Sequence, residues 1–282
     1  MRNFYNAKIV TNKGDILNLG LDYGIAFDIT PLSGTDIDVS TSQSFQQIGE
    51  SVENSSVLGL TREIYGVIID NEKTTQEKLF KVFSAFSSGR LYIGDRYCDF
   101  VTSKTPYISR EKSGRLTFMT AIFCPYPFWL DEKLSEYIFG GITPAFSFPV
   151  IYDNHRYSTR KPLEATNCHN KGNVKQTMEI EFSTFASSSG FGLRDDTTGN
   201  FIKVNEEISG EDKVIVRQEN GELKIELIRD GRKTNIISKL AEKSTLFELN
   251  TGDNILTPFA DDGIANLNVY VKFNPAYTGV IV

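Results

Sequence analysis

Histidine, tryptophan and cysteine are scarce in this chain of 282 residues, which has 2 His, 1 Trp and 3 Cys. Histidine is the side chain most often recruited for acid–base catalysis near neutral pH and for zinc binding. The cysteines, Cys98, Cys124 and Cys168, are odd in number and widely spaced, which is typical of free buried thiols in a reducing compartment. The scarcity predicts no metal site, no cofactor and no histidine-based active site.

The sequence motifs of nucleotide-binding and acyl-transfer enzymes are also missing. There is no G-x-x-x-x-G-K-[ST] phosphate loop, no G-x-G-x-x-G after a strand and no G-x-S-x-G elbow. Asp195–Asn200 lacks the spaced acidic positions and the final glutamate of a calcium loop, so we expect a polar turn there. The neighbours Cys168 and His169 would point to opposite faces of an extended segment. The sequence therefore predicts that the chain is not an enzyme.

Positive charge is not in excess, since 30 Lys and Arg face 36 Asp and Glu and give a net charge of −6. The parts before and after residue 146 carry −3 each (14 minus 17, and 16 minus 19). Binding to nucleic-acid phosphates needs a basic surface, so sequence-specific nucleic-acid binding is not expected. The most apolar stretch, residues 120–130, is broken by two prolines and is shorter than the about 20 residues that cross a bilayer. No secretory signal is recognisable, and we expect no membrane partner.

One amphipathic helix is predicted, over residues 75–87. Thr74 and Glu77 have the spacing of a capping box, in which each side chain satisfies a free backbone N–H at the start of a helix. The apolar positions that follow recur on one helix face and are Leu79, Val82, Phe83 and Phe86. Gly89 lies where a left-handed C-terminal cap would end the helix.

Most of the remaining sequence is typical of short β-strands separated by turns. Runs of β-branched or alternating residues lie at 7–10, 64–69, 91–93, 116–123, 178–182 and 267–273, and Asn220-Gly221 joins two further runs as a hairpin. The fold class is therefore predicted to be mainly β. We expect an N-terminal β-barrel or sandwich domain with one α-helix over residues 1–145 and a second β-sandwich over residues 146–282, because Gly and Pro punctuate residues 131–149.

Two segments are candidates for contacts between subunits. Residues 30–60 are rich in Ser, Thr, Gln and Gly and predict a long loop with an irregular extended strand, in which Phe45 and Ile48 are candidate contact residues. The second candidate is an aromatic cluster around two prolines, which contains Tyr126, Phe128 and Trp129. This cluster would also suit an aromatic plug that packs one end of a barrel, or a surface on which a sugar stacks.

The order of short motifs along the chain resembles that of the distal tail proteins of siphophages, the long-tailed, non-contractile bacteriophages. The motifs of the first half are GRLYI at 89–93, CDFV at 98–101, LTF at 116–118 and CPYPFW at 124–129. Those of the second half are GNV at 172–174, TGN at 198–200, the Asn-Gly hairpin, DG at 230–231, LNTGDN at 249–254 and YTG at 277–279. Each motif is weak alone, but their succession spans nearly the full chain.

This resemblance implies the compact form of the family, whose C-terminal domain is a galectin-like β-sandwich. It also implies a structural protein of the virion, assembled in the cytoplasm of the bacterial host. Six copies would form a ring at the tail tip, or baseplate, with DNA passing through it. The implied partners are other copies of the chain, the tail tube protein, the tail-associated protein that forms the fibre or lysin hub, and receptor-binding or baseplate proteins.

The alternative is a carbohydrate-binding module that attaches to sugars of the host surface. Galectin-type sugar sites depend on a His, Asn, Arg and Trp on one sheet, and residues 146–282 contain no Trp. This departure counts against sugar binding, although Tyr or Phe could still stack on a sugar. A cell-wall hydrolase is a third possibility, and nothing in the sequence points to it.

Overall fold

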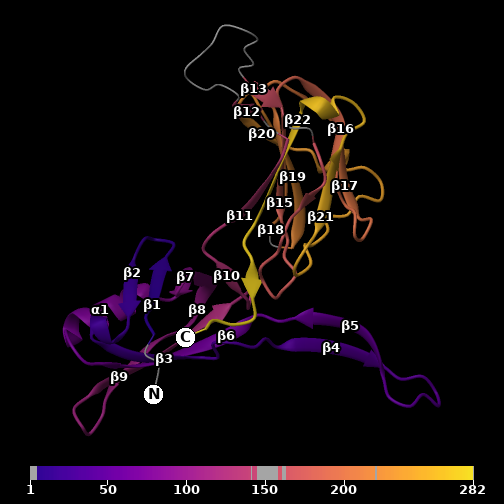
Figure 1. The fold of residues 1–282 in the computed structure, drawn as a ribbon. Coiled ribbons are helices and arrows are strands. Elements are labelled where there is room, and N and C mark those ends of the chain that lie inside the picture. The colour runs from indigo at the N-terminus through magenta and orange to yellow at the C-terminus, as the bar shows by residue number, and fades with distance from the viewer. Residues whose placement is uncertain (1–4, 141, 145–157, 161–162, 220, 282) are drawn as a thin grey trace. The chain divides into compact units, whose positions relative to one another are not determined.

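The structure is a computed structural model that describes residues 5–140, 142–144, 158–160, 163–219 and 221–281 (Figure 1). It divides the chain into two compact units, of which unit 1 is Met1–Lys133 with Ala276–Val282 and unit 2 is Leu134–Pro275. The predicted boundary between residues 145 and 146 lies outside the described residues. In the described part of the chain, no helix is long and apolar enough to cross a membrane.

Unit 1 is built on a nine-stranded sheet with one α-helix beside it. Its strands are β1 Ala7–Thr11, β2 Ile16–Leu19, β3 Ile25–Thr30, β6 Leu60–Ile68, β7 Ser88–Ile93, β8 Arg96–Arg110, β9 Leu116–Cys124, β10 Trp129–Asp131 and β23 Ala276–Tyr277, with the 3-10 helix η1 at Leu21–Tyr23. The order is β2-β1-β7-β8-β9-β6-β3, and β10 pairs with both β8 and β23. Every described pairing in this sheet is antiparallel.

Alternation along the strands of unit 1 separates a core face from an outer face. On β6, Ile64 is fully buried, whereas Tyr65, the next residue, is exposed. Helix α1, Glu72–Val82, packs against β1, β2 and β8 and adds Leu79 and Val82 to the core. Burial of this one apolar face is the main favourable contribution to unit 1.

The predicted helix is present, but its bounds and its cap are corrected. It begins at Glu72 after Asn71, whose backbone is left-handed with φ 52, and no side chain caps it, so the capping box at Thr74 is not formed. It ends at Val82, because the chain turns after Phe83 and enters β7. Phe86 therefore leaves the predicted apolar stripe and is almost completely exposed, with φ 64.

Unit 2 is a β-sandwich of a six-stranded and a four-stranded sheet with a small extra pair. Its elements are β11 Ser135–Phe139, β12 Ile142–Pro144, β13 Ser158–Arg160, β14 Thr166–Asn167, β15 Glu179–Thr184, β16 Ser187–Asp195, β17 Phe201–Ser209, β18 Lys213–Glu219, β19 Glu222–Arg229, β20 Arg232–Asn235, η2 Ile237–Lys239, β21 Ile255–Phe259, η3 Ile264–Asn266 and β22 Leu267–Phe273. The orders are β11-β22-β15-β18-β19-β20 and β14-β21-β16-β17, and β12 pairs with β13. Buried apolar side chains from both larger sheets form one core.

The mainly β fold class and the strands predicted from alternation are confirmed. The hairpin β18–β19 has Glu219 opposite Glu222, with Gly221 at φ 81, and it buries Ile225 and Leu227 on one face, as predicted. Residues 30–60 differ from the expected long loop. They contain a regular hairpin of two strands, β4 Ile37–Ser42 and β5 Ser51–Val57, which form a sheet of their own.

Candidate assembly surfaces

The hairpin β4–β5 forms an arm on unit 1, which we define as residues 36–58. Figure 1 shows the two strands extending away from the nine-stranded sheet. All side chains of both strands are exposed, and no third strand pairs with them in the described part of the chain. An isolated two-stranded hairpin is marginally stable in water, so the arm lacks the packing that normally stabilises strands.

The register of the arm gathers its apolar side chains on one face. Ile37 pairs with Val57, Val39 with Ser55 and, beyond a bulge, Thr41 with Val52. Side chains directly opposite one another share a face, as do those two positions apart on one strand. The four apolar side chains of this face, all about half exposed or more, are Ile37, Val39, Val52 and Val57. The opposite face carries polar side chains.

The tip of the arm presents two of the residues singled out from the sequence. Phe45 is 94% exposed and Ile48 is completely exposed. The turn that holds them is organised by Gln47, whose Oε1 accepts from the backbone N–H of Ser44 at 3.0 Å and whose Nε2 donates to Ser51 Oγ at 2.8 Å. Large apolar side chains exposed in this way on an ordered turn are typical of a contact surface.

The aromatic cluster is divided between surface and core. Tyr126 is partly exposed and its ring meets that of the half-buried Phe128 edge to face, with centroids 5.2 Å apart. Trp129 is instead fully buried, and its Nε1 donates to the carbonyl of Leu32 at 2.8 Å. The guanidinium of Arg62 stacks on the Trp129 ring at 4.7 Å. The structure therefore corrects the prediction for Trp129, whose side chain lies in the core of unit 1 and is not available for a contact between subunits.

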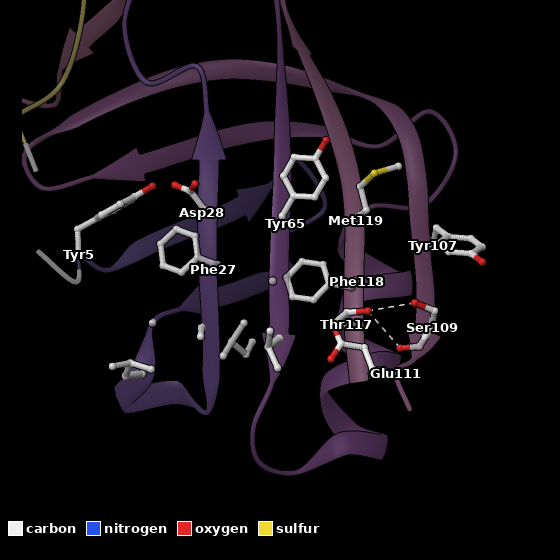
Figure 2. A pocket seen from close by; sticks show the side chains of 16 residues that line it. Tyr5, Phe27, Asp28, Tyr65, Tyr107, Ser109, Glu111, Thr117, Phe118 and Met119 are labelled. Carbon is white, nitrogen blue, oxygen red and sulfur yellow. Dashed lines mark hydrogen bonds between the residues drawn. The ribbon is translucent and has the colours of Figure 1, made fainter. Parts of the chain in front are cut away.

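A second surface was not predicted from the sequence. It is a hollow of about 920 Å³ on unit 1, lined from β3, β6, β8 and β9 (Figure 2). Asp28, Tyr65, Met119 and Tyr107 form one row across these four strands, because each is paired with the next. The row lies on the outer face, where the tyrosines are exposed. The sequence contains little indication of this hollow, because these four residues are far apart in the chain and become neighbours only through the order of the strands in the sheet.

The environment of the hollow is mixed, with aromatic rings beside acidic groups. The Tyr65 hydroxyl donates to the Glu63 carboxylate, and this hydrogen bond raises the pKa of Tyr65 above its ordinary value. Tyr5 covers the free edge of β3 and accepts a hydrogen bond from the backbone N–H of Ile29. Burial raises the pKa of Tyr5 to about 12. Both tyrosines are therefore neutral hydrogen-bonding groups near pH 7.

The residues considered above for catalysis or metal binding take part in local hydrogen bonds or in the core. Cys168 is buried while His169 is exposed, as expected for neighbours in an extended segment, and His169 Nδ1 lies 2.7 Å from Asp253 Oδ1. Asp195 folds the predicted polar turn by accepting from Thr198 Oγ1 at 2.7 Å. His155 lies outside the described residues. Among the residues that the structure describes, no group of three His, Cys, Asp or Glu could hold a metal ion.

Comparisons with known proteins agree with the architecture. Residues 171–277 match the family model of the siphovirus-type tail component, C-terminal domain. The chain is similar to the crystal structure of the Dit protein (gp 19.1) of phage SPP1, a hub adsorption apparatus of phages that infect Gram-positive bacteria. The TM-score is 0.61 and the identity 11%, over 94% of this chain and 98% of that chain.

The chain also resembles chains of the phage P2 baseplate in its activated conformation, with Ca and with Sr. The TM-scores are 0.45 and 0.46 and the identities 9% and 10%, over 95% of this chain and 97% of each of those chains. No curated protein matches the chain.

Residues 171–277, which include most strands of the two sandwich sheets, thus match the C-terminal domain of a siphovirus-type tail component. The fold of the whole chain is that of a siphovirus distal tail protein. The resemblance inferred from the sequence is thereby confirmed. It follows that the protein has a structural role in a phage tail or baseplate and a place in the virion.

Proposed function

We propose that six copies of the chain form a ring at the tail tip, assembled in the cytoplasm of the bacterial host. Unit 1 makes the ring, which joins the tail tube protein to the tail-associated protein. Unit 2 docks receptor-binding or baseplate proteins. DNA passes through the ring, and the net charge of −6 is compatible with passage without strong adhesion.

The exposed apolar face of the arm is the observation that carries this proposal. A hairpin of two strands gains little stability on its own, so a partner that covers Ile37, Val39, Val52 and Val57 would stabilise it. The residues Phe45 and Ile48 would extend the same contact at the tip. Tyr126 and Phe128 would contribute a further patch, supported from the core by Trp129.

A cyclic ring needs two different surfaces on each copy, because its contacts are head to tail. Unit 1 offers such a pair of surfaces in the projecting arm and the aromatic hollow. We infer that the arm of one copy contacts the hollow of the next, where Tyr65 and Tyr107 are exposed. Apolar arm side chains and aromatic rings are suited to one another, since aromatic residues are enriched in protein interfaces.

Light scattering of the purified chain, over a concentration series into the micromolar range, tests the ring. We expect a species of about six times 31.6 kDa. Two changes should shift the population toward monomer: removal of the tip residues 43–50, and the double change Ile37→Ser with Val57→Ser. Asp38→Ser, on the polar face of the same strand, is the matched control for the arm and should leave the mass unchanged.

The hollow is tested in the same experiment with Tyr107→Ser, which should also lower the associated fraction. Phe86→Ser is its control, because Phe86 is an aromatic residue outside both proposed surfaces and is even more exposed, at 95% against 67% for Tyr107. If the chain is a monomer at every concentration, with or without the arm, the support for self-assembly is removed. Sugar binding by unit 2 then becomes the favoured function. Association that persists both after the arm tip is removed and after Ile37→Ser with Val57→Ser would show that the arm is not the contact.

A further inference from the structure

Two of the buried cysteines lie together in unit 1. Cys98 is in β8 and Cys124 is the last residue of β9, and their Sγ atoms are 3.7 Å apart. Both side chains are buried, and both are free thiols. The two sulfur atoms are therefore in direct contact without a covalent bond.

The contact lies where β8 changes its neighbour. Strand β9 pairs with β8 as far as the pair Val101 and Phe123, and β10 takes over at Tyr97. Within the described ladders, residues 98–100 of β8 have no backbone partner on this side. A bond between the two sulfur atoms would join the strands at the place where their hydrogen-bond ladder is interrupted.

A cation stands beside the pair. The positive charge of the fully buried Arg62 favours the thiolate form at both sulfur atoms. The hydrogen bond with Cys98, assisted by this positive charge, lowers the pKa of Cys124 although the thiol is buried. The same hydrogen bond, together with burial, raises the pKa of Cys98 well above its ordinary value. The charge of Arg62 thus favours one thiolate in the pair, and we assign the first attack to Cys124, the last residue of β9.

We propose that Cys98 and Cys124 are an oxidisable pair that forms an intramolecular disulfide between β8 and β9. A disulfide needs the sulfur atoms to approach to about 2.0 Å, and rotation about the side-chain bonds of both residues supplies movement in that direction. The class of oxidant is a low-molecular-weight disulfide.

The exchange proceeds in two steps. The thiolate of Cys124 attacks one sulfur of the oxidant, the S–S bond of the oxidant breaks, and a thiolate leaves. Cys98 then loses its proton to a leaving thiolate and attacks Cys124 Sγ in the mixed disulfide, which expels the second thiolate. Two protein thiols are oxidised by two electrons, and one disulfide of the oxidant is reduced to two thiols.

Burial sets the rate of this reaction, because the oxidant must reach Cys124. The opening required is small, since Cys124 ends its strand and is followed by Pro125 and an exposed Tyr126. Cys168 provides the contrast within the same chain. It is buried alone in unit 2, and burial raises the pKa of its thiol to about 12, so it should remain reduced.

The time at which the bond forms rests on the proposed function. A virion that leaves the cell passes from reducing to oxidising surroundings, where disulfides persist. The bond would then link two strands of the ring-forming unit in the finished particle. The oxidation itself depends only on the folded chain, so failure of the pair to oxidise and failure of the ring to assemble are separate outcomes.

The experiment treats the reduced, folded, full-length chain with oxidised glutathione, then unfolds it in the presence of N-ethylmaleimide and measures its mass. We expect a product that takes up one maleimide instead of three and has lost about 2 Da to the new bond. Peptide mapping should join the peptides of Cys98 and Cys124. A reducing agent should restore three reactive thiols, and the oxidised chain should have the higher Tm.

Variants and the unsubstituted chain together make the outcome decisive. Cys168→Ser is the matched control and should still form the bond, whereas Cys98→Ser and Cys124→Ser should not. Because a serine could disturb the core, mapping of the unsubstituted chain is the primary readout. The proposal would be overturned if the chain kept three free thiols after exposure to the oxidant for many unfolding lifetimes. It would also be overturned if disulfides to Cys168 formed as often as the disulfide between Cys98 and Cys124.

Discussion

The side chain of Arg62 joins several parts of unit 1. Its guanidinium is fully buried, donates to the carbonyls of Pro31 and Pro127, and stacks on Trp129. These contacts link strand β6 to the base of the arm and to the aromatic segment before β10. A buried charge is tolerated only where hydrogen bonds and a ring face replace its hydration.

Replacing Arg62 by Met should destabilise the chain by about 2 kcal/mol, because two buried carbonyls lose their donors. Urea unfolding followed by circular dichroism would measure the change. Arg110→Met is the control, since Arg110 makes an exposed ion pair with Glu72 at 2.7 Å and its loss should cost less than about 1 kcal/mol. Equal stabilities of the two variants would show that Arg62 is replaceable by any side chain of similar volume.

A second prediction concerns Asp212, which holds the turn between β17 and β18. Its Oδ2 accepts from Arg229 Nε at 2.9 Å and from the backbone N–H of Ser209 at 3.1 Å. The hydrogen bond from Arg229 lowers the pKa of Asp212 below its ordinary value of 3.8. Because the pKa is lower in the folded state, the carboxylate stabilises the fold above the unfolded-state value, and this contribution disappears as the pH falls through the folded-state value.

Asp212→Asn should therefore cost about 1 kcal/mol at pH 7 and less near pH 3, below the unfolded-state pKa, where protonation of the carboxyl has begun to remove its contribution in the parent chain. Thermal unfolding at the two pH values measures the difference. Glu211→Gln, a change at the exposed neighbouring residue, should have little effect at either pH. A cost that is the same at pH 7 and pH 3 would assign the effect to shape and not to charge.

At the scale of elements, helix α1 shows how a local pattern can mislead. Asn71 starts the helix in a left-handed conformation that asparagine tolerates, and Thr74 and Glu77 lie exposed within it. Thr74→Ala should consequently change the free energy of unfolding by less than about 0.5 kcal/mol, whereas loss of a true cap would cost about 1 kcal/mol. Denaturant unfolding of this variant and of the parent chain measures the change. A loss of about 1 kcal/mol would show that the Thr74 side chain does cap the helix.

The strands were predictable where the sequence alternates and one face is buried. Residues 267–273 were predicted with the observed bounds because β22 lies inside a sheet and keeps strict alternation. The arm was not predicted, since its strands bury neither face and carry no such signal. Gly89 shows the same limit, because an added Cβ there would overlap the Val10 carbonyl and lie 2.7 Å from Thr11 Cα. It is a glycine for strand packing and not for a helix cap.

The candidate sites were predictable to a similar extent. Phe45 and Ile48 were singled out because apolar residues are conspicuous in a polar segment, and the structure leaves both side chains exposed; their role in a contact stays a prediction. The sequence could not distinguish Trp129 from its aromatic neighbours. Its burial depends on contacts with Leu32 and Arg62, which precede it in the chain by 97 and by 67 positions (129 minus 62). The hollow depended on strand order and was therefore not visible in the sequence.

At the scale of the whole molecule, unit 2 is inserted into unit 1. The last strand of unit 1 is β23, in which Tyr277 pairs with Trp129. The guanidinium of Arg96 stacks on the Tyr277 ring, 3.5 Å from its centroid. Its hydroxyl also bonds Asp131 Oδ2 at 3.2 Å. Within unit 2, the first and last strands, β11 and β22, pair with each other at Ser135 and Phe273.

Removing residues 276–282 should therefore destabilise unit 1 and leave unit 2 folded. Hydrogen exchange measured by mass spectrometry should show lost protection in β8 and β10, while β15 and β18 keep theirs. Removal of residues 280–282 alone, which spares β23, is the control. Loss of protection throughout unit 2 in the longer truncation would indicate that the two units unfold as one.

The inserted arrangement also has a consequence for synthesis on the ribosome. Strand β23 is translated only after all of Leu134–Pro275, so the sheet of unit 1 waits for its last strand while unit 2 emerges with every one of its strands available. N-terminal domains usually fold first during synthesis. Here unit 1 can complete its sheet only after unit 2 has been synthesised. A nascent chain would carry a folded sandwich before β23 completes the sheet of unit 1.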